Sequence, residues 1–415
     1  MINRLLSLIG LKRIDDSHAL AKMITAGYET DTGVSVTTKT ALENPAVYTC
    51  VRILTNSVGM LPVAAYEKLN NARNEISNFR IHRLVSISPN EYQTAQEFWE
   101  MCVMHLALRG NFYAWKNVVN GELRELLPLN PAGVTPKWTD DRQIVYEVDF
   151  ENGATNVYRT DEVFHVKLPS YDGLTGLSPI GWQRETIGLS IALQKHGARV
   201  FKNGTRLSGV LHTPEVIGDE GYKRIKESWD ETYAGVENAN KVAILEHGLQ
   251  FQGLSMSNED AQFLESRKYT ATEIYGIYGV PPHLAGNLDR ATFSNIEHQG
   301  QEFVVYALMP YLTRIESRVR FSLIEKKHQA KRYIKFNVGA LVRGDMKARG
   351  EFYTRMIQNG AMSPNEIRAL EEMNPRDGGD IYLTPINMAI DGKPVGDNAG
   401  EKGNDDTNQR LTAEG

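Results

Sequence analysis

The sequence is poor in cysteine and has no long apolar run. Cys50 and Cys102 are the only cysteines among 415 residues, which excludes a disulfide framework and a cysteine-based zinc site. We expect two buried thiols in a reducing compartment. The apolar stretch near the start, residues 5–11, has about a third of the roughly 20 residues that a membrane-spanning helix needs. It is also too short for a signal peptide. We therefore expect no membrane segment and synthesis in the cytoplasm.

The sequence also lacks a strong excess of either positive or negative charge. The 46 lysines and arginines face 51 acidic residues, for a net charge of −5, and 41% of the residues are hydrophobic. This composition disfavours bulk disorder, a fibrous protein and a generally basic DNA-coating protein, while it allows local basic faces. The length predicts two to three domains.

Catalytic and cofactor motifs are missing too. The sequence has no phosphate-binding lysine loop, no HExxH and no GxSxG. Residues 176–179 come nearest to a nucleophile turn, but a helix cap followed by a first-turn proline explains them better. Glu297 and His298 would point about 100° apart on a helix, which is poor geometry for a metal site with Asp289. We expect no catalytic residues, no metal, no cofactor and no enzyme activity.

The first half of the chain has an α+β pattern. Asn44 and Pro45 predict the start of a helix that ends near Gly59, and a second helix is predicted over residues 95–108. Alternating apolar residues and two Asn-Gly turns predict antiparallel ribbons. The predicted strands are 61–68, 111–119, 122–127, 143–150, 155–159 and 162–167.

Two long helices then bracket a small insert. The first is predicted from Ser178 and Pro179 to Lys202, and its three internal glycines indicate that a neighbouring helix comes close. The second starts at Ser257 or Asn258 and ends before Pro281. The insert has predicted strands at 208–212, 241–245 and 250–254, a helix at 219–233, and a small core of Trp229, Tyr233 and Phe251.

The remainder is mostly helical. A third long helix is predicted over residues 294–324, and Pro310 should kink it or split it. A strand at 333–338 and helices at 345–359 and 363–373 follow. The tail from residue 391 has five glycines, six acidic residues and three basic ones, so we expect it to be disordered.

Two stretches concentrate positive charge. Lys195, Arg199 and Lys202 follow each other at i, i+4 and i+7 on one helix face. Residues 314–355 contain twelve basic and four acidic residues, a balance of +8. Such stretches either face phosphates or an acidic partner, or they are solvated and paired internally, for example Glu316 with Arg320. The sequence alone leaves both alternatives open.

Several segments, in order along the chain, resemble the portal proteins of tailed bacteriophages of the long-tailed, lambdoid-like type. They include AVYTCVRILTNSVGMLPVAAY (residues 46–66), ALRGNFYAW (107–115), DGLTGLSPIG (172–181) and EDAQFLESRKYTATEIYGIYGVPPHLAG (259–286). The likeness covers about residues 40–385. No single segment is catalytic, and the specificity lies in the ordered set.

The resemblance implies a homo-oligomeric ring, usually a dodecamer, at one capsid vertex of the virion. Double-stranded DNA would be packaged through its tunnel by the terminase large subunit and later ejected, and contact with DNA would be non-specific. The other implied partners are the major capsid or scaffold protein and the head-tail connector (adaptor). Two alternatives remain: a metal-dependent DNA-processing enzyme and a domesticated prophage scaffold without a packaging role.

The implied fold class is α+β with named regions. These are an N-terminal arm (1–40), an α+β wing (41–177), stem helices (178–206 and 257–282), a clip (207–256), a tunnel loop (283–293), a kinked helix returning through the wing (294–340), a helical crown (341–389) and an acidic tail (390–415). The residues expected to contact DNA are Lys195, Arg199 and Lys202 on the stem, and Asn287, Asp289, Arg290 and Thr292 on the loop.

Overall fold

In the computed structural model the chain forms two compact units, residues 1–338 and residues 339–415. Among the residues that the structure describes, no helix could span a membrane. The described residues are 30–69, 72–202, 209–212, 218–224, 227, 250–253, 258–287, 299–340, 346–371, 373–383, 389–390 and 393–394.

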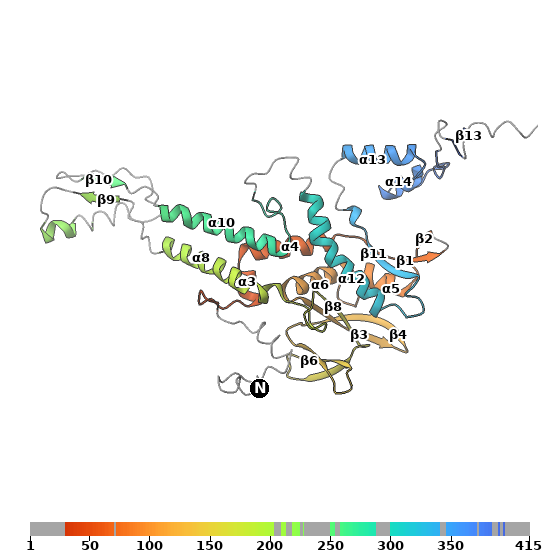
Figure 1. The fold of residues 1–415 in the computed structure, drawn as a ribbon, viewed down its shortest axis with the longest axis horizontal. Helices are drawn as coiled ribbons and strands as arrows, with labels where there is room; N and C mark the ends of the chain where they lie inside the picture. Colours follow the sequence, from red (N-terminus) through yellow and green to blue (C-terminus); the bar gives the residue numbers. More distant parts are fainter. Residues whose placement is uncertain are drawn as a thin grey trace, which may run out of the picture. The chain divides into compact units, whose positions relative to one another are not determined.

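Two helices, α4 and α6, form the centre of the first unit and pack against each other (Figure 1). Asn44 caps α4 as predicted, because its side chain accepts from the N–H groups of Ala46 and Val47. Gly110, with φ of 73°, ends α6 in the left-handed conformation that glycine adopts readily. The helices of this part are α3 (Thr38–Leu42), α4 (Pro45–Gly59), α5 (Arg80–Ser86) and α6 (Ala95–Arg109).

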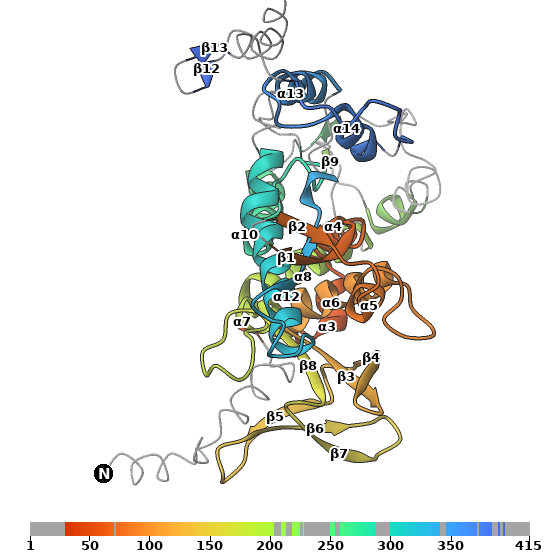
Figure 2. The ribbon, with the colours of Figure 1, turned by 90° about the vertical axis from the view of Figure 1, so that its right-hand side faces the viewer.

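The first unit also contains three three-stranded antiparallel sheets, in the orders β11-β1-β2, β4-β3-β8 and β5-β6-β7. Asn120 and Gly121 both have positive φ, which confirms the predicted hairpin turn between β3 and β4. Figure 2 shows the last two sheets next to each other, and Tyr113, Tyr146 and Val163 pack between them. The strands are β1 (Val63–Leu69), β2 (Ala72–Glu75), β3 (Asn111–Val119), β4 (Glu122–Leu129), β5 (Val134–Trp138), β6 (Ile144–Asp149), β7 (Thr155–Arg159), β8 (Val163–Lys167) and β11 (Arg332–Phe336).

The prediction of one continuous helix over 179–202 is wrong. The structure has a short α7 (Pro179–Trp182) and a separate α8 (Arg184–Lys202), because Gln183 leaves the helical conformation at φ −105° and ψ 25°. The short helix is held against α6 by the Ser178 hydroxyl, which donates to the Leu108 carbonyl at 2.9 Å. Ser178 also caps α7, which confirms the interpretation of residues 176–179 as a helix start.

The helix α10 (Asn258–Tyr278) lies beside α8 (Figure 1). A Cβ on Gly197 of α8 would lie 3.1 Å from the Phe263 ring of α10, so this glycine marks the predicted close approach of a neighbouring helix. Gly188 instead faces the side chain of Thr30. Residues 30–40 of the predicted arm are thus partly packed on α8, whereas residues 1–29 lie outside the described residues.

The insert between α8 and α10 is described only in part. β9 (Gly209–His212) and β10 (Gln250–Gly253) pair antiparallel, and residues 219–224 are helical, as predicted. The predicted strand at 241–245 and the side chains of Trp229, Tyr233 and Phe251 lie outside the described residues.

The helix around Pro310 changes its hydrogen-bonding pattern, as a proline inside a helix predicts. A π-helical segment, η3 (Phe303–Leu308), precedes α12 (Met309–Ser322), and the Met309 N–H donates to the Val304 carbonyl five residues earlier. Proline has no N–H to donate to the carbonyl four residues earlier, and its ring clashes with the carbonyl at that position. The apolar stripe Leu308, Leu312, Ile315 and Val319 is fully buried.

The second unit contains α13 (Met346–Gln358) and α14 (Pro364–Leu370). Ser363 and Glu366 form the predicted capping box, but α14 ends at Leu370, three residues before the predicted end. Two short strands, β12 (Ala389–Ile390) and β13 (Lys393–Pro394), pair where the tail begins. The tail beyond residue 394 lies outside the described residues.

Candidate functional site

Two of the seven residues predicted to contact DNA lie close together on α8. Lys195 and Arg199 are both exposed, and they flank Gly197, which faces α10. Each lies two residues from Gly197, about 160° around the helix, so both point away from α10. Lys202 ends α8, but its side chain lies outside the described residues.

The predicted tunnel loop begins with a series of tight turns. The N–H of Asn287 donates to the Pro282 carbonyl at 2.9 Å, and its side chain is half-buried. His283 anchors the turn through Gln299, with 2.7 Å between Nδ1 and Oε1. Asp289, Arg290 and Thr292 lie outside the described residues. The turns follow α10, which ends at Tyr278, about 22 Å along the helix from Phe263.

Part of the positive charge in residues 314–355 is used inside the protein, whereas Lys326 and Lys331 are exposed. Glu316 pairs with Lys335 at 2.7 Å, and Arg320 donates to the Gln329 carbonyl at 2.5 Å. The example pair Glu316–Arg320 is therefore wrong, because Glu316 turns toward β11, where it also accepts from the Phe336 N–H. For these residues the structure favours internal pairing over a phosphate-binding surface.

A buried polar network ties the sheets to the loop that leads into α7. His165 contacts the Tyr146 hydroxyl through Nδ1 at 3.2 Å and the Asn111 Oδ1 through Nε2 at 3.1 Å. Asn111 also accepts from the Gly176 N–H at 2.7 Å and donates to the Gly176 carbonyl at 2.9 Å. Burial raises the pKa of the Tyr146 hydroxyl, and the positive charge of Arg318 opposes this rise. The network therefore positions the start of the α7–α8 segment on the sheets.

The electrostatics of this network keep His165 neutral. Burial, followed by the charges of Arg318 and Lys167, lowers its pKa well below the ordinary value. Because the Asn111 Oδ1 can only accept, the His165 Nε2 carries the proton and Nδ1 accepts from Tyr146. Sequence reasoning missed this network, since Asn111 and His165 are 54 positions apart and share no motif.

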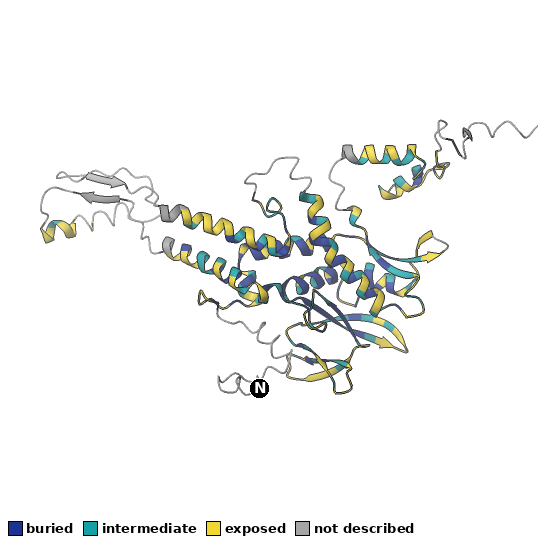
Figure 3. Ribbon diagram, in the orientation of Figure 1, coloured by how far each residue is buried: buried dark blue, intermediate teal, exposed yellow. Residues whose placement is uncertain are grey.

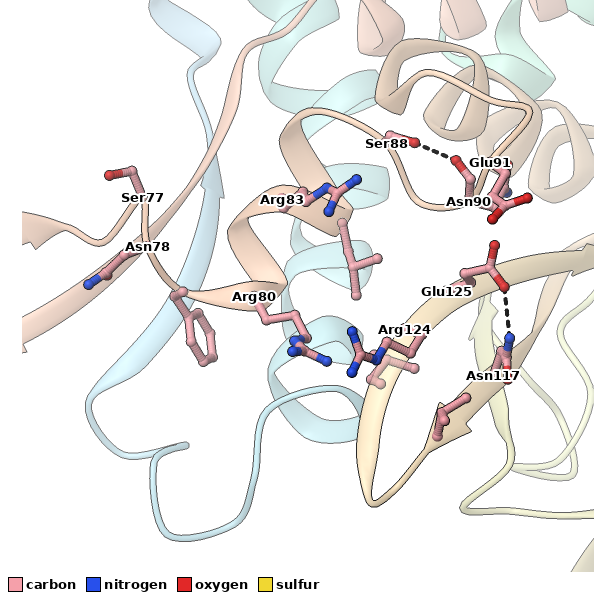
Figure 4. Close-up of a pocket in the computed structure, with 14 residues that line it drawn as sticks. Ser77, Asn78, Arg80, Arg83, Ser88, Asn90, Glu91, Asn117, Arg124 and Glu125 are labelled. Atoms are coloured by element: carbon pink, nitrogen blue, oxygen red, sulfur yellow. Dashed lines mark hydrogen bonds between the residues drawn. The ribbon is translucent and has the colours of Figure 1, made fainter.

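An open pocket of about 900 Å³ lies between α5, residues 87–93 and the β3–β4 hairpin (Figure 4). Arg80 and Arg124 project toward it, and both pair with Glu122, at 2.8 and 3.1 Å. On the other side Asn117 donates to Glu125 at 2.7 Å. The lining is a mixture of paired charges with no nucleophile and base in contact, and the described residues contain no cluster of metal ligands.

A family model described as phage portal protein matches residues 45–372. The chain belongs to the phage portal protein family. It is 31% identical over 378 residues to the probable portal protein of Streptomyces phage phiC31, covering 86% of this chain and 80% of that one. It is 32% identical over 356 residues to the portal protein of Enterobacteria phage HK97, covering 84% and 83%. The resemblance found in the sequence is confirmed.

Solved structures agree on the portal fold. A chain from the neck of a native gene transfer agent particle, computed with C12 symmetry, aligns with a TM-score of 0.59 and 22% identity, over 86% of this chain and 99% of that one. A chain from the virion of a native gene transfer agent particle aligns with a TM-score of 0.60 over the same shares. The predicted α+β portal fold is therefore confirmed.

The portal family is a structural one. The boundaries predicted for arm, wing, stem, clip, loop, crown and tail stay predictions, as do the seven DNA contacts.

Proposed function

We propose that this portal chain assembles into a closed ring at one vertex of a phage capsid, through which double-stranded DNA is packaged and later ejected. The family match over residues 45–372 carries the proposal. The symmetry of the related neck structures, computed with C6 and C12 symmetry, supports a ring of identical copies. The chain would then reside in the virion after synthesis in the cytoplasm of the bacterial host.

The proposed role in DNA movement is passive. A ring lumen presents the same side chains repeatedly to the phosphate backbone, and contact with base edges would hinder sliding. The acidic balance of −5 suits this role, because a strongly basic lumen would hold the DNA instead of letting it pass. The proposed partners are the terminase large subunit, the head-tail connector and the major capsid or scaffold protein.

For DNA contact we propose the loop that begins at residue 283, with Asn287, Asp289, Arg290 and Thr292. The contact of His283 with Gln299 anchors the first turns of this loop. The rest of the loop would therefore extend toward the DNA from a fixed starting point. Replacing Arg290 with Glu should lower packaging in an assay with terminase and proheads while ring assembly stays intact. Unchanged packaging would overturn the assignment of the loop to the tunnel.

The experiment that tests the ring itself is the mass of the purified full-length chain. Size-exclusion light scattering and negative-stain images should show a ring of about twelve copies with a central hole. A monomer that persists when capsid and scaffold proteins are added would overturn the proposal. No observation on the described residues favours the DNA-processing enzyme or the scaffold without a packaging role.

A further inference from the structure

The helix pair α8–α10 is largely exposed along its length (Figure 3), and its two outer sides carry charged residues of opposite sign. On α8 the flank that points away from α10 carries the exposed cations Lys195 and Arg199. We call Lys195 and Arg199 the basic flank. The opposite side of the pair, on α10, carries two exposed carboxylates, Glu265 and Glu273, and one exposed cation, Lys268, which already makes a contact of its own.

The orientation of α10 follows from the same contact. Phe263 faces Gly197 of α8, and Glu265 comes two residues later, about 160° around the helix. Tyr269 and Glu273 follow Glu265 at four-residue intervals, each about 40° further around the helix, and all three side chains are exposed. Tyr269 is 67% exposed, although it is a large aromatic residue. We call Glu265, Tyr269 and Glu273 the acidic flank.

These charges are unpaired within the part of the chain that the structure describes. Among the described residues, Lys195, Arg199, Glu265 and Glu273 make no ion pair and no side-chain hydrogen bond. The contrast with residues 314–355 is clear, because there Glu316, Arg320, Arg332 and Lys335 all find partners inside the unit. The two flanks of the helix pair are thus complementary to each other and cannot meet within one copy.

A ring with more than two copies needs such a pair of surfaces. In a cyclic assembly larger than a dimer the contact is heterologous, so one patch of each copy meets a different patch of the next copy. We infer that the basic flank of α8 on one copy contacts the acidic flank of α10 on the next copy. This inference rests on the proposed ring and names the surface that closes it.

The contact gives each group a physical role. Opposite charges on the two flanks set the order in which copies join, and like charges would meet if a copy were turned around. Tyr269 would be covered between the two carboxylates, where an aromatic side chain adds apolar contact area at a small cost in conformational entropy. Lys195 and Arg199 then bind protein, whereas the sequence predicted that they contact DNA.

Charge reversal of each flank tests the inference on the full chain. Lys195→Glu with Arg199→Glu makes both flanks acidic, and Glu265→Lys with Glu273→Lys makes both basic. Each double variant should lose the ring on light scattering, or need about tenfold more protein to form it. The control is Lys326→Glu with Lys331→Glu, the same charge change at exposed positions after α12, which should leave the ring intact.

Mixing the two double variants tests whether the opposite charges of the two flanks must meet. The two double variants combined one to one should recover rings with alternating copies, because each acidic flank then meets a basic one. The variant with all four substitutions should also form rings. If the double variants form rings like the unchanged chain, or if neither mixing nor the fourfold variant restores them, the inference is overturned.

The two proposals fail in different ways. A natural chain that forms no ring, even with its capsid partners, contradicts the proposed function. A natural chain that forms rings, with variants that behave as the control does, contradicts only the contact between the flanks. Should the double variant of α8 form normal rings that package no DNA, the cations belong to the tunnel, as the sequence predicted.

Discussion

The α4–α6 region and the α8–α10 helix pair differ in what stabilises them. Around α6 the rings of Phe98, Trp99 and Phe112 are almost fully buried and make edge-to-face contacts at 5.1 and 5.3 Å between centroids. On α10 most side chains between residues 262 and 269 are exposed (Figure 3). The helix contacts both α8 and α4, and in this half Phe263 faces Gly197 of α8.

This difference indicates which surfaces a neighbouring copy would cover in the ring. The first region buries a continuous apolar core within a single copy, so its stability does not depend on a neighbour. The helix pair leaves charges and a large aromatic side chain in solvent, which is expected of a surface that a second copy covers. Substitutions in the two regions should therefore affect different measurements.

The largest effect on folding is expected at Trp99. Trp99→Ala removes a buried ring that packs on Phe98 and Phe336, and it leaves the Val85 carbonyl without its 2.8 Å hydrogen bond. We expect the free energy of unfolding in urea to fall by about 3–5 kcal/mol. Trp138, which is 57% exposed, is the matched control, and Trp138→Ala should change it by less than about 0.5 kcal/mol. Equal losses of unfolding free energy in the two variants would contradict the assignment of Trp99 to a core that stabilises the first region.

The next effect is a loss of stability in acid that comes from the first region. Burial, followed by the charge of Arg109, lowers the pKa of His105 from 6.5 to about 4. The unfolded chain therefore binds this proton more readily, so stability is complete above pH 6.5 and is lost as the pH falls toward 4. We expect about 3 kcal/mol from this group. Urea titrations at several pH values should show a shallower slope in His105→Phe, and an unchanged slope would refute the assignment.

Substitution of one glycine in each region tests how tightly that region is packed. Gly110 has φ of 73°, and a Cβ there would lie 2.2 Å from the Leu177 carbonyl oxygen, so Gly110→Ala should cost about 2 kcal/mol or more. Gly197→Ala meets only the end of the Phe263 ring, at 3.1 Å, and gains helix propensity worth about 1 kcal/mol. We expect its unfolding free energy in urea to stay within about 1 kcal/mol of the unchanged chain. A larger loss at Gly197 would mean that the helix pair is as tightly packed as the first region.

The smallest effect on folding is expected at Tyr269. Tyr269→Ala removes an exposed side chain, so unfolding in urea should change by less than about 0.5 kcal/mol. The same substitution should weaken the ring in light scattering, because the acidic flank loses its apolar contact. A large loss of folding stability with an unchanged ring would reverse the roles that we assign to the two regions.

The short-range features were predictable because each depends on a few neighbouring residues. Asn44 and Pro45 determine the start of α4, Asn120 and Gly121 the hairpin turn, Ser363 and Glu366 the capping box, and Pro310 the break before α12. The break at Gln183 was not predictable, because the contact of Ser178 with the Leu108 carbonyl joins positions 70 residues apart. The strand β2 was missed because all four of its residues are exposed and it has no apolar alternation. The helix α5 was missed because it is only seven residues long, too short for its apolar residues Ile81, Leu84 and Val85 to stand out as a period.

The sequence by itself determined the family, the α+β class and most of the elements, since caps, turns and apolar periods act over one or two turns of chain. Only the tertiary structure decided which charges are left without a partner. Glu316 and Lys335 meet because β11 passes beside α12, whereas Lys195 and Glu265 point to opposite sides because Gly197 and Phe263 face each other. Pairing of charges depends on distances of a few ångströms between distant segments, and the spacing of residues along the chain does not contain them.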